Sequence, residues 1–251
     1  MCTVSWRIGP DGYDLFFNRD ELNSRAPETP PALAEMEGVK FIAPRDGDHG
    51  GTWLSINEHS LTVCLLNDYA NPWRPTKESP LFSRGHLVLA CAPAESIASV
   101  VEIVTRQPLA RTMPFRVLAI SMGEEPLLLH WTGIDLAQSR GASVSIPLSS
   151  SSYATDEVVK ARQLRLREYV RSMNKPEVPE LAAYHRQHST DAGAHSVLMR
   201  RSDAATRSVM QVSVNSSHVK CIYQSVRQSA TGPALDKPIT LTMPVARAVV
   251  L

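Results

Sequence analysis

Cys2 directly follows Met1 and is the residue of this chain best suited to nucleophilic chemistry. Removal of Met1 would leave a thiol and a free α-amine on one residue. The reference pKa is about 7.7–8.0 for an α-amine and about 8.5 for a thiol, so the amine can take the proton of the thiol near neutral pH. Covalent catalysis needs such a nucleophile and base. Cys2 is therefore a candidate for attack on an acyl carbon.

The segments around Cys2 determine whether this end of the chain is held in place. Residues 2–8 and 13–19 have strand-like composition, and Gly9-Pro10-Asp11-Gly12 between them is rich in turn-forming residues. A hairpin with this turn places residue 2 opposite roughly residue 19. The cation of Arg19 would then lower the pKa of the thiol. On position alone, an incidental cysteine on a frayed terminus remains the alternative.

The remaining elements come in groups of strands and groups of helices. Helical patterns cover 81–105 with a break near Pro93, then 155–173 and 178–188. Strand-like runs are 39–43, 52–57, 61–66, 115–122, 126–131, 142–146, 195–200, 208–214, 219–223 and 240–245. Residues 21–37 are rich in Pro and Glu and are interpreted as an irregular surface loop. Grouping without strict alternation favours two antiparallel sheets with helices outside.

The bulk composition limits the classes of function. The chain has 251 residues, 26 basic and 25 acidic, so no excess charge favours nucleic acid or an anionic membrane. Its four cysteines form no C-x-x-C pair, which favours free thiols in a reducing compartment. No apolar run approaches the ~20 residues that span a bilayer. We expect one domain over 1–251, cytoplasmic, with no nucleic-acid partner and no membrane span.

Several motifs, in order and spacing, resemble one family. They are Cys2-Thr3-Val4, Phe17-Asn18-Arg19-Asp20-Glu21, Gly50-Gly51-Thr52-Trp53-Leu54 and Leu65-Leu66-Asn67, with later support at 150–153 and 202–206. The chain thereby resembles the NRDE-motif family, which includes the transport-and-Golgi-organisation proteins. That family is similar to a distant branch of the N-terminal-nucleophile hydrolases, near the penicillin V acylase and conjugated bile-acid hydrolase group.

This resemblance implies an α+β fold, a four-layer αββα sandwich of two mostly antiparallel sheets. It also implies hydrolysis of a non-peptide amide or similar acyl bond in a small acylated molecule, with no cofactor. The identity of the substrate does not follow from it. The runner-up is a non-catalytic carrier or trafficking protein on the same fold, which would bind haem or a lipid-like ligand. Either function is compatible with a homo-oligomer.

The resemblance further implies catalytic roles for five residues. Cys2 attacks the acyl carbon, Arg19 stabilises the thiolate and Asp20 orients the α-amine. Asn67 donates a hydrogen bond to the oxyanion, and one such donor is typically worth about 2.7–4 kcal/mol in the transition state. Arg201 is the candidate for a late arginine near the nucleophile.

The expected substrate-binding residues are Asn18, Trp53, Ser150 and Ser151. The acylases use a second asparagine as oxyanion donor where this chain has serines. The serine hydroxyls or backbone N–H groups at a helix start could replace it, or the hydrolase site has decayed. Since side chains alternate along a strand, residues 18–21 cannot all face one pocket, and we expect Asn18 and Glu21 to be the more structural pair.

Three other patterns are interpreted as solvated surface, and no metal site is expected. His185 and His188 are one helical turn apart, a spacing that can bind metal, but no third ligand is evident. Arg162 belongs to a run of arginines on a predicted helix, which is usually a solvated face. Residues 46–49 lack the continuation of a calcium-binding loop and predict a solvated turn.

Overall fold

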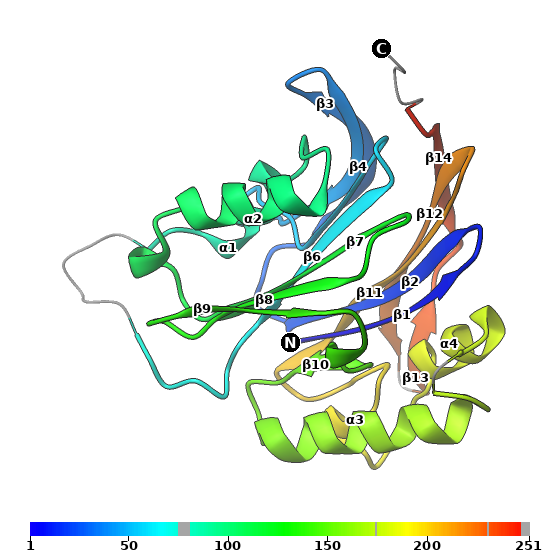
Figure 1. Cartoon of the computed structure of the whole chain (residues 1–251). Helices are drawn as coiled ribbons and strands as arrows, with labels where there is room; N and C mark the ends of the chain where they lie inside the picture. Colours follow the sequence, from blue (N-terminus) through cyan, green and yellow to red (C-terminus); the bar gives the residue numbers. More distant parts are fainter. Residues whose placement is uncertain (75–80, 174, 230, 247–251) are drawn as a thin grey trace.

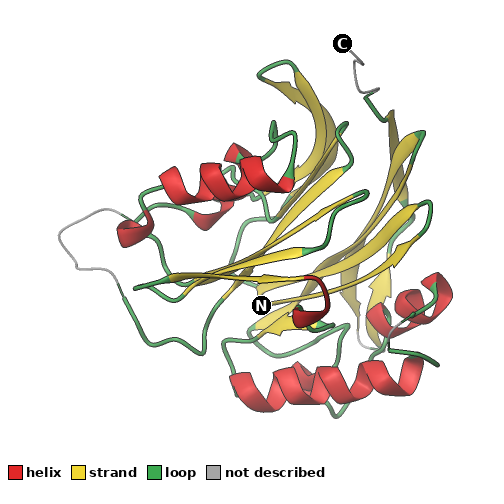
Figure 2. Ribbon diagram, in the orientation of Figure 1, coloured by secondary structure: helices red, strands yellow, loops and turns green. Residues whose placement is uncertain are grey.

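The chain forms two stacked antiparallel sheets enclosed by two pairs of helices, an αββα arrangement (Figures 1 and 2). The computed structural model describes residues 1–74, 81–173, 175–229 and 231–246. The α+β sandwich expected from the sequence is therefore confirmed.

The first sheet contains the N-terminal hairpin and has the order β10-β1-β2-β11-β12-β13, with β14 also paired to β12. Its strands are β1 (Cys2–Gly9), β2 (Gly12–Leu22), β10 (Leu148–Ser150), β11 (Ala204–Asn215), β12 (His218–Ser229), β13 (Gly232–Leu235) and β14 (Ile239–Pro244).

The second sheet follows chain order, β3-β4-β5-β6-β7-β8-β9. Its strands are β3 (Thr29–Met36), β4 (Val39–Arg45), β5 (Leu54–Asn57), β6 (Leu61–Asn67), β7 (Phe115–Ser121), β8 (Leu127–Trp131) and β9 (Leu136–Arg140).

The four α-helices of the described residues cover the outer faces of the sheets. α1 (Arg84–Ala90) and α2 (Ile97–Arg106) pack on the second sheet through an apolar cluster that includes Leu87, Val100 and Val117. α3 (Thr155–Tyr169) and α4 (Val178–His185) pack on the first sheet. Within the described parts of the chain, no helix is long and apolar enough to cross a membrane.

The main core lies between the sheets and follows from strand alternation. Every second residue of β1 and β2 faces this core, including Val4, Leu15 and Phe17. The intervening residues face α3 and α4, where Phe16 packs on the helices. This alternation decides which residues of the Asn18–Glu21 motif reach each face.

The N-terminal hairpin has the predicted register. Cys2 pairs with Arg19, and Gly9 pairs with Gly12 at the turn. β1 lies between β2 and β10, because Cys2 also pairs with Ser150. Cys2 is therefore held in the interior of a sheet, which argues against a frayed terminus.

Some predicted elements were wrong. The predicted loop at 21–37 contains β3, an edge strand that tolerates its prolines because an edge has unpaired backbone positions. The predicted strand at 195–200 contributes only a bridge at Arg200, although its apolar residues are buried. The strand predicted at 142–146 was misplaced, since β9 precedes it and β10 follows it. Burial of an extended loop produces the same apolar run as a strand.

Candidate active site

Cys2 lines a cavity of about 460 Å³, which we call the Cys2 cavity. Four other residues singled out in the sequence also line it, namely Arg19, Asp20, Trp53 and Asn67. The cavity extends to the start of α1. Its volume lies in the range of about 300–1,000 Å³ that is usual for small-molecule pockets.

The Asn18–Glu21 motif divides between the two faces of β2. Arg19 follows the inward alternation of Leu15 and Phe17, and Asn18 and Asp20 have their side-chain partners on the helix side. The expected structural pair is therefore divided: Asn18 is buried and holds the backbone of His185 and Val197, whereas Glu21 lines the Cys2 cavity. Asn18, which was also expected to bind substrate, does not line this cavity. The period of two groups Asn18 with Asp20, and Arg19 with Glu21.

The thiol of Cys2 is protonated while Met1 is in place. Burial raises its pKa to about 11, and the carboxylate of Asp20 acts in the same direction. The positive terminal amine and Arg19 oppose this rise without cancelling it. The thiolate is the reactive species of a cysteine, so this form of the site is not activated.

The charge of Arg19 is largely neutralised by ion pairs with carboxylates. Its guanidinium lies 2.5 Å from Glu28, 2.7 Å from Asp46 and 3.4 Å from Glu21. It also lies over the ring of Trp53, 4.4 Å from the centroid. The carboxylates hold the guanidinium in place and reduce the positive field that reaches the thiol.

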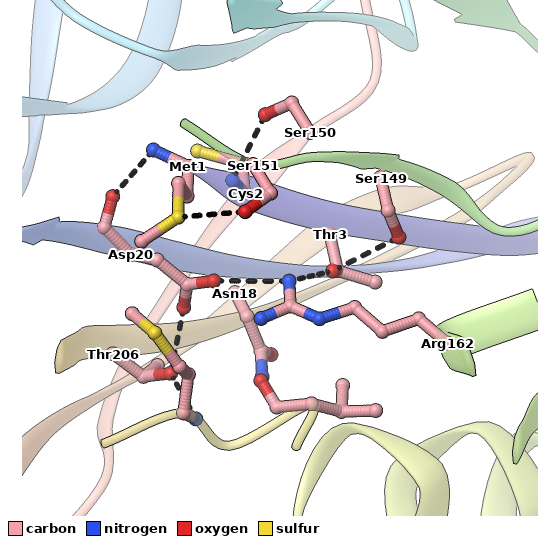
Figure 3. A network of polar contacts seen from close by, with 12 residues as sticks. Met1, Cys2, Thr3, Asn18, Asp20, Ser149, Ser150, Ser151, Arg162 and Thr206 are labelled. Carbon is pink, nitrogen blue, oxygen red and sulfur yellow. Dashed lines mark hydrogen bonds and ion pairs between the residues drawn. The ribbon is translucent and has the colours of Figure 1, made fainter. Parts of the chain in front are cut away.

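Met1 fills the space next to Cys2 on the helix side. It is buried, and its terminal amine donates to the backbone oxygen of Asp20 at 3.0 Å. Its sulfur lies 3.2 Å from the Ser151 hydroxyl oxygen (Figure 3). The sulfur also lies 3.7 Å from Arg201 Nη1. Burial opposes the charge of this amine, but the electrostatic effect of the neighbouring Tyr69, Cys2, Asp20 and Glu21 outweighs burial and raises the pKa of the amine.

The two serines of β10 and its following loop have different positions. The backbone N–H of Cys2 donates to Ser150 Oγ at 3.1 Å (Figure 3). Ser151 donates to the backbone oxygen of Tyr153, and neither serine lines the Cys2 cavity. Arg201 is likewise outside the lining, where it pairs with Asp203 and lies over the Tyr153 ring.

Asn67 and Trp53 provide neutral donors at the Cys2 cavity. Asn67 ends β6, and its Nδ2 donates to the Tyr69 hydroxyl at 2.8 Å. The indole Nε1 of Trp53 is buried and has no partner among the described residues.

The carboxylate of Asp20 belongs to a buried network centred on Arg162 (Figure 3). Oδ2 lies 3.0 Å from Arg162 Nη1, and Oδ1 accepts from the Thr206 hydroxyl at 2.6 Å. Arg162 Nη1 also donates to Thr3 Oγ1 at 2.6 Å. Asp20 thus contacts the terminal amine through its backbone oxygen, and its carboxylate faces the helix layer.

Arg162 is a residue whose role sequence reasoning missed. The prediction of a solvated face was wrong, because its side chain is fully buried. The spacing could have predicted its burial, since Val158, Arg162 and Leu166 lie four residues apart and form the buried stripe of α3. An arginine in an apolar stripe indicates a buried partner, here Asp20.

The prediction that His185 is solvated was also wrong. His185 is fully buried, with Nδ1 at 2.8 Å from Asn18 Oδ1 and Nε2 at 2.7 Å from Ser5 Oγ. Asn18 Nδ2 donates to the backbone oxygens of His185 and Val197. Because Asn18 Oδ1 can only accept, Nδ1 carries the proton and Nε2 accepts from Ser5. Burial, with the charges of Arg162 and Arg186, lowers the pKa of His185 to about 3.

Residues 46–49 do form a turn, but Asp46 is not simply solvated. Arg19 and Arg25 both contact its carboxylate, Arg25 at 2.6 Å. Burial opposes ionisation of this group, but these contacts and the His49 N–H lower its pKa. The described residues hold no group of three or more His, Cys, Asp and Glu side chains arranged for a metal ion.

Comparisons with known proteins give a family and a set of similar folds. Residues 1–230 match the family model described as Transport and Golgi organisation 2. The comparison with curated proteins found no match.

Three solved structures illustrate the fold similarity. A mutant of conjugated bile acid hydrolase from Clostridium perfringens has a TM-score of 0.59 at 9% identity, over 97% of this chain and 92% of that one. Penicillin V acylase from Agrobacterium tumefaciens has a TM-score of 0.56 at 11% identity, over 93% and 84%. The Caenorhabditis elegans ortholog of N-acylethanolamine-hydrolyzing acid amidase has a TM-score of 0.57 at 7% identity, over 84% and 92%.

Proposed function

The chain belongs to the Transport and Golgi organisation 2 family, and on its N-terminal-nucleophile-hydrolase fold we propose that it hydrolyses a non-peptide amide or similar acyl bond in a small molecule. Cys2 is the nucleophile after loss of Met1. The proposal is supported chiefly by one observation. Cys2 is pinned at the start of an interior strand and lines a cavity of about 460 Å³.

Loss of Met1 changes the site in two ways. It converts the backbone N–H of Cys2, which now donates to Ser150 Oγ at 3.1 Å, into a free α-amine. It also empties the buried space that Met1 occupies beside Ser151 and Arg201. Ser150 Oγ would then remain the hydrogen-bond partner of the amine.

The reaction follows from this arrangement. The α-amine takes the thiol proton, and Sγ attacks the acyl carbon. Asn67 donates to the oxyanion, and Arg19 supports the thiolate as far as its carboxylate partners allow. The C–N bond then breaks, the leaving amine takes the proton, and a thioester remains on Cys2. Water hydrolyses this thioester, releasing the acid and restoring the thiol.

Asp20 has a positioning role in this proposal. Its carboxylate is fixed by Arg162 and Thr206, contacts that do not involve Met1 and remain after its loss. The network therefore sets the position of the strand next to Cys2.

Intact mass of the purified protein is the first test. A mass without Met1 is expected, because only that form has an amine on Cys2. A protein that fully retains Met1 would exclude this mechanism.

Turnover of N-acyl amides by wild type, Cys2→Ala and Cys221→Ala is the second test. We expect Cys2→Ala to lose about a thousandfold or more in kcat/KM, as enzymes do without their nucleophile. Cys221 is buried in the core, and the matched variant should keep the activity. Co-purified haem or lipid that persists in Cys2→Ala, without turnover in wild type, would favour the carrier.

A further inference from the structure

Arg84 differs from the other arginines of the Cys2 cavity. Arg19 and Arg25 also line it, and both are paired with carboxylates. Arg84 forms no ion pair within residues 1–74, 81–173, 175–229 and 231–246, and Nη1 donates only to the backbone oxygen of Pro114, at 3.1 Å. The cavity thus holds one guanidinium whose charge has no protein counter-ion in that part of the chain.

The position of Arg84 is fixed by close backbone packing. Arg84 begins α1, and the next residue, Gly85, lies against Gly51. A Cβ on Gly51 would be 2.7 Å from the backbone carbon of Gly85, so only glycine allows this approach. Thr52 N–H also donates to the backbone oxygen of Gly85 at 3.1 Å. The Gly50-Gly51-Thr52 motif therefore holds the start of α1 at the cavity.

The electrostatic surroundings of Arg84 are incomplete. Burial lowers the pKa of its guanidinium, and Tyr69, Glu21 and Cys2 only partly offset this effect. A half-buried cation without a counter-ion is unfavourable, and a bound anion would compensate it. Guanidinium binds carboxylates in particular, because its N–H groups match the two oxygens.

Part of the cavity lining is apolar, and the carboxylates of its polar part, Asp20, Glu21 and Asp46, are each paired with an arginine. Trp53, Leu65, Leu81, Phe82 and Met113 line it together with Arg84. An occupant that matches both parts has an apolar portion and an anionic group.

We infer that Arg84 binds the carboxylate of the substrate, which makes the substrate class an anionic N-acyl compound with an apolar chain. The reaction of this compound at Cys2 rests on the proposed function, whereas its binding does not. The carboxylate can lie on the amine side or on the acyl side of the amide, since Arg84 would contact either one by the same chemistry.

Binding to the Cys2→Ala protein tests the inference without turnover. The probes are N-decanoylglycine, with its carboxylate on the amine side, and N-decylsuccinamic acid, with its carboxylate on the acyl side. Each is compared by calorimetry with its neutral primary amide. At least one acid is expected to bind roughly 10- to 100-fold more tightly than its amide, the usual range for a hydrogen bond to a charged group. Equal affinities for both pairs would overturn the inference.

Variants at Arg84 test whether this residue provides the preference. In the Cys2→Ala background, Arg84→Gln should abolish the difference between acid and amide, and Arg84→Lys should retain part of it. Arg106→Gln is the matched control, since Arg106 is exposed on α2 and should leave the difference intact. A preference that survives in folded Arg84→Gln would overturn the inference. The acid–amide comparison on Cys2→Ala decides even where Arg84→Gln does not fold.

Turnover by wild type separates this inference from the proposed function. Arg84-dependent binding of an acid, with no hydrolysis of it by protein that has lost Met1, would leave the inference standing and contradict the proposed function. Hydrolysis of acid and amide with the same KM, unchanged by Arg84→Gln, would support the proposed function and contradict the inference about Arg84.

Discussion

Both faces of the β1–β2 hairpin carry polar side chains near Cys2, but the two faces differ in what those side chains contact. On the helix side, Asp20 and Asn18 have protein partners for their polar atoms, and both are buried. On the side of the second sheet, Cys2 and Arg19 line a cavity. The Asn18–Glu21 motif therefore fixes β2 to the helices with one face and lines the cavity with the other, because side chains alternate along a strand.

Charge is distributed differently on the two faces. On the helix side the buried cation Arg162 is balanced by the carboxylate of Asp20, and His185 is kept neutral by burial. On the cavity side, Arg19 and Arg25 contact the carboxylates of Glu21, Glu28, Asp46 and Asp48. The helix side therefore contributes mainly to stability, whereas the arginines on the cavity side can exchange their carboxylate partners for a ligand.

The largest expected effect on this comparison comes from Arg162→Met. The change leaves the carboxylate of Asp20 buried without its cation, and breaking a buried pair in this way costs about 3–5 kcal/mol of unfolding free energy. Urea denaturation of purified protein measures it.

Two further variants sharpen this measurement. Arg165→Met, on the exposed side of α3, should change the unfolding free energy by less than about 1 kcal/mol. The double variant Asp20→Asn with Arg162→Met should lose less than the sum of the two single variants, because it leaves no unpaired charge. Additive losses, or a loss in Arg162→Met as small as in Arg165→Met, would remove the basis of the comparison.

The part of the site formed by residues close in sequence could be predicted. The turn at 9–12 and the two flanking strands predicted the pairing of Cys2 with Arg19. These features are close in the chain and follow from turn chemistry and strand period. The αββα fold required the family resemblance, because the grouping of elements indicates two sheets without giving their strand order.

The partners of the Asn18–Glu21 motif could not be predicted, because they come from distant segments of the chain. Arg19 contacts Asp46, and Asp20 contacts Arg162, which is 142 residues further along the chain. Glu28 also lies in the segment that was interpreted as a loop. Nothing local to these residues specifies which carboxylate meets which guanidinium. Arg84 was not predicted for the same reason, since only the fold determines that no carboxylate among the described residues pairs with it.

The second expected effect is a pH dependence from His185 on the helix side. Its pKa is about 3 in the folded protein and near the ordinary 6.5 in the unfolded chain, so the unfolded state binds more protons between these values. Stability should therefore fall as pH falls below 6.5, by at most about 1.4 kcal/mol per pH unit. Asp46 and Asp68 have lowered pKa values, so their contribution is lost only at still lower pH, below about 4.

Urea denaturation of wild type and His185→Gln at pH 4.5, 5.5 and 6.5 measures this effect. The variant should be less stable than wild type at pH 6.5 and should lose the slope. His188→Gln is the control three residues further along, beyond the end of α4, and it should keep the slope, since His188 is only partly buried. An unchanged slope in His185→Gln would show that another group on this face titrates.

The smallest expected effect comes from Glu21→Gln and is informative because Glu21 adjoins Asp20 in the same motif. The Glu21 carboxylate is 26% exposed and lies 3.4 Å from Arg19, which keeps Glu28 and Asp46 as partners when Glu21 is neutralised. Screening by solvent limits the change in unfolding free energy to less than about 1 kcal/mol. Asp20→Asn, measured in parallel, should cost several times more, because Arg162 would remain buried and charged. If the two adjacent substitutions cost the same, strand alternation would not separate an anchoring face from a reactive one, and Asp20 would have no stronger claim than Glu21 to the positioning of Cys2.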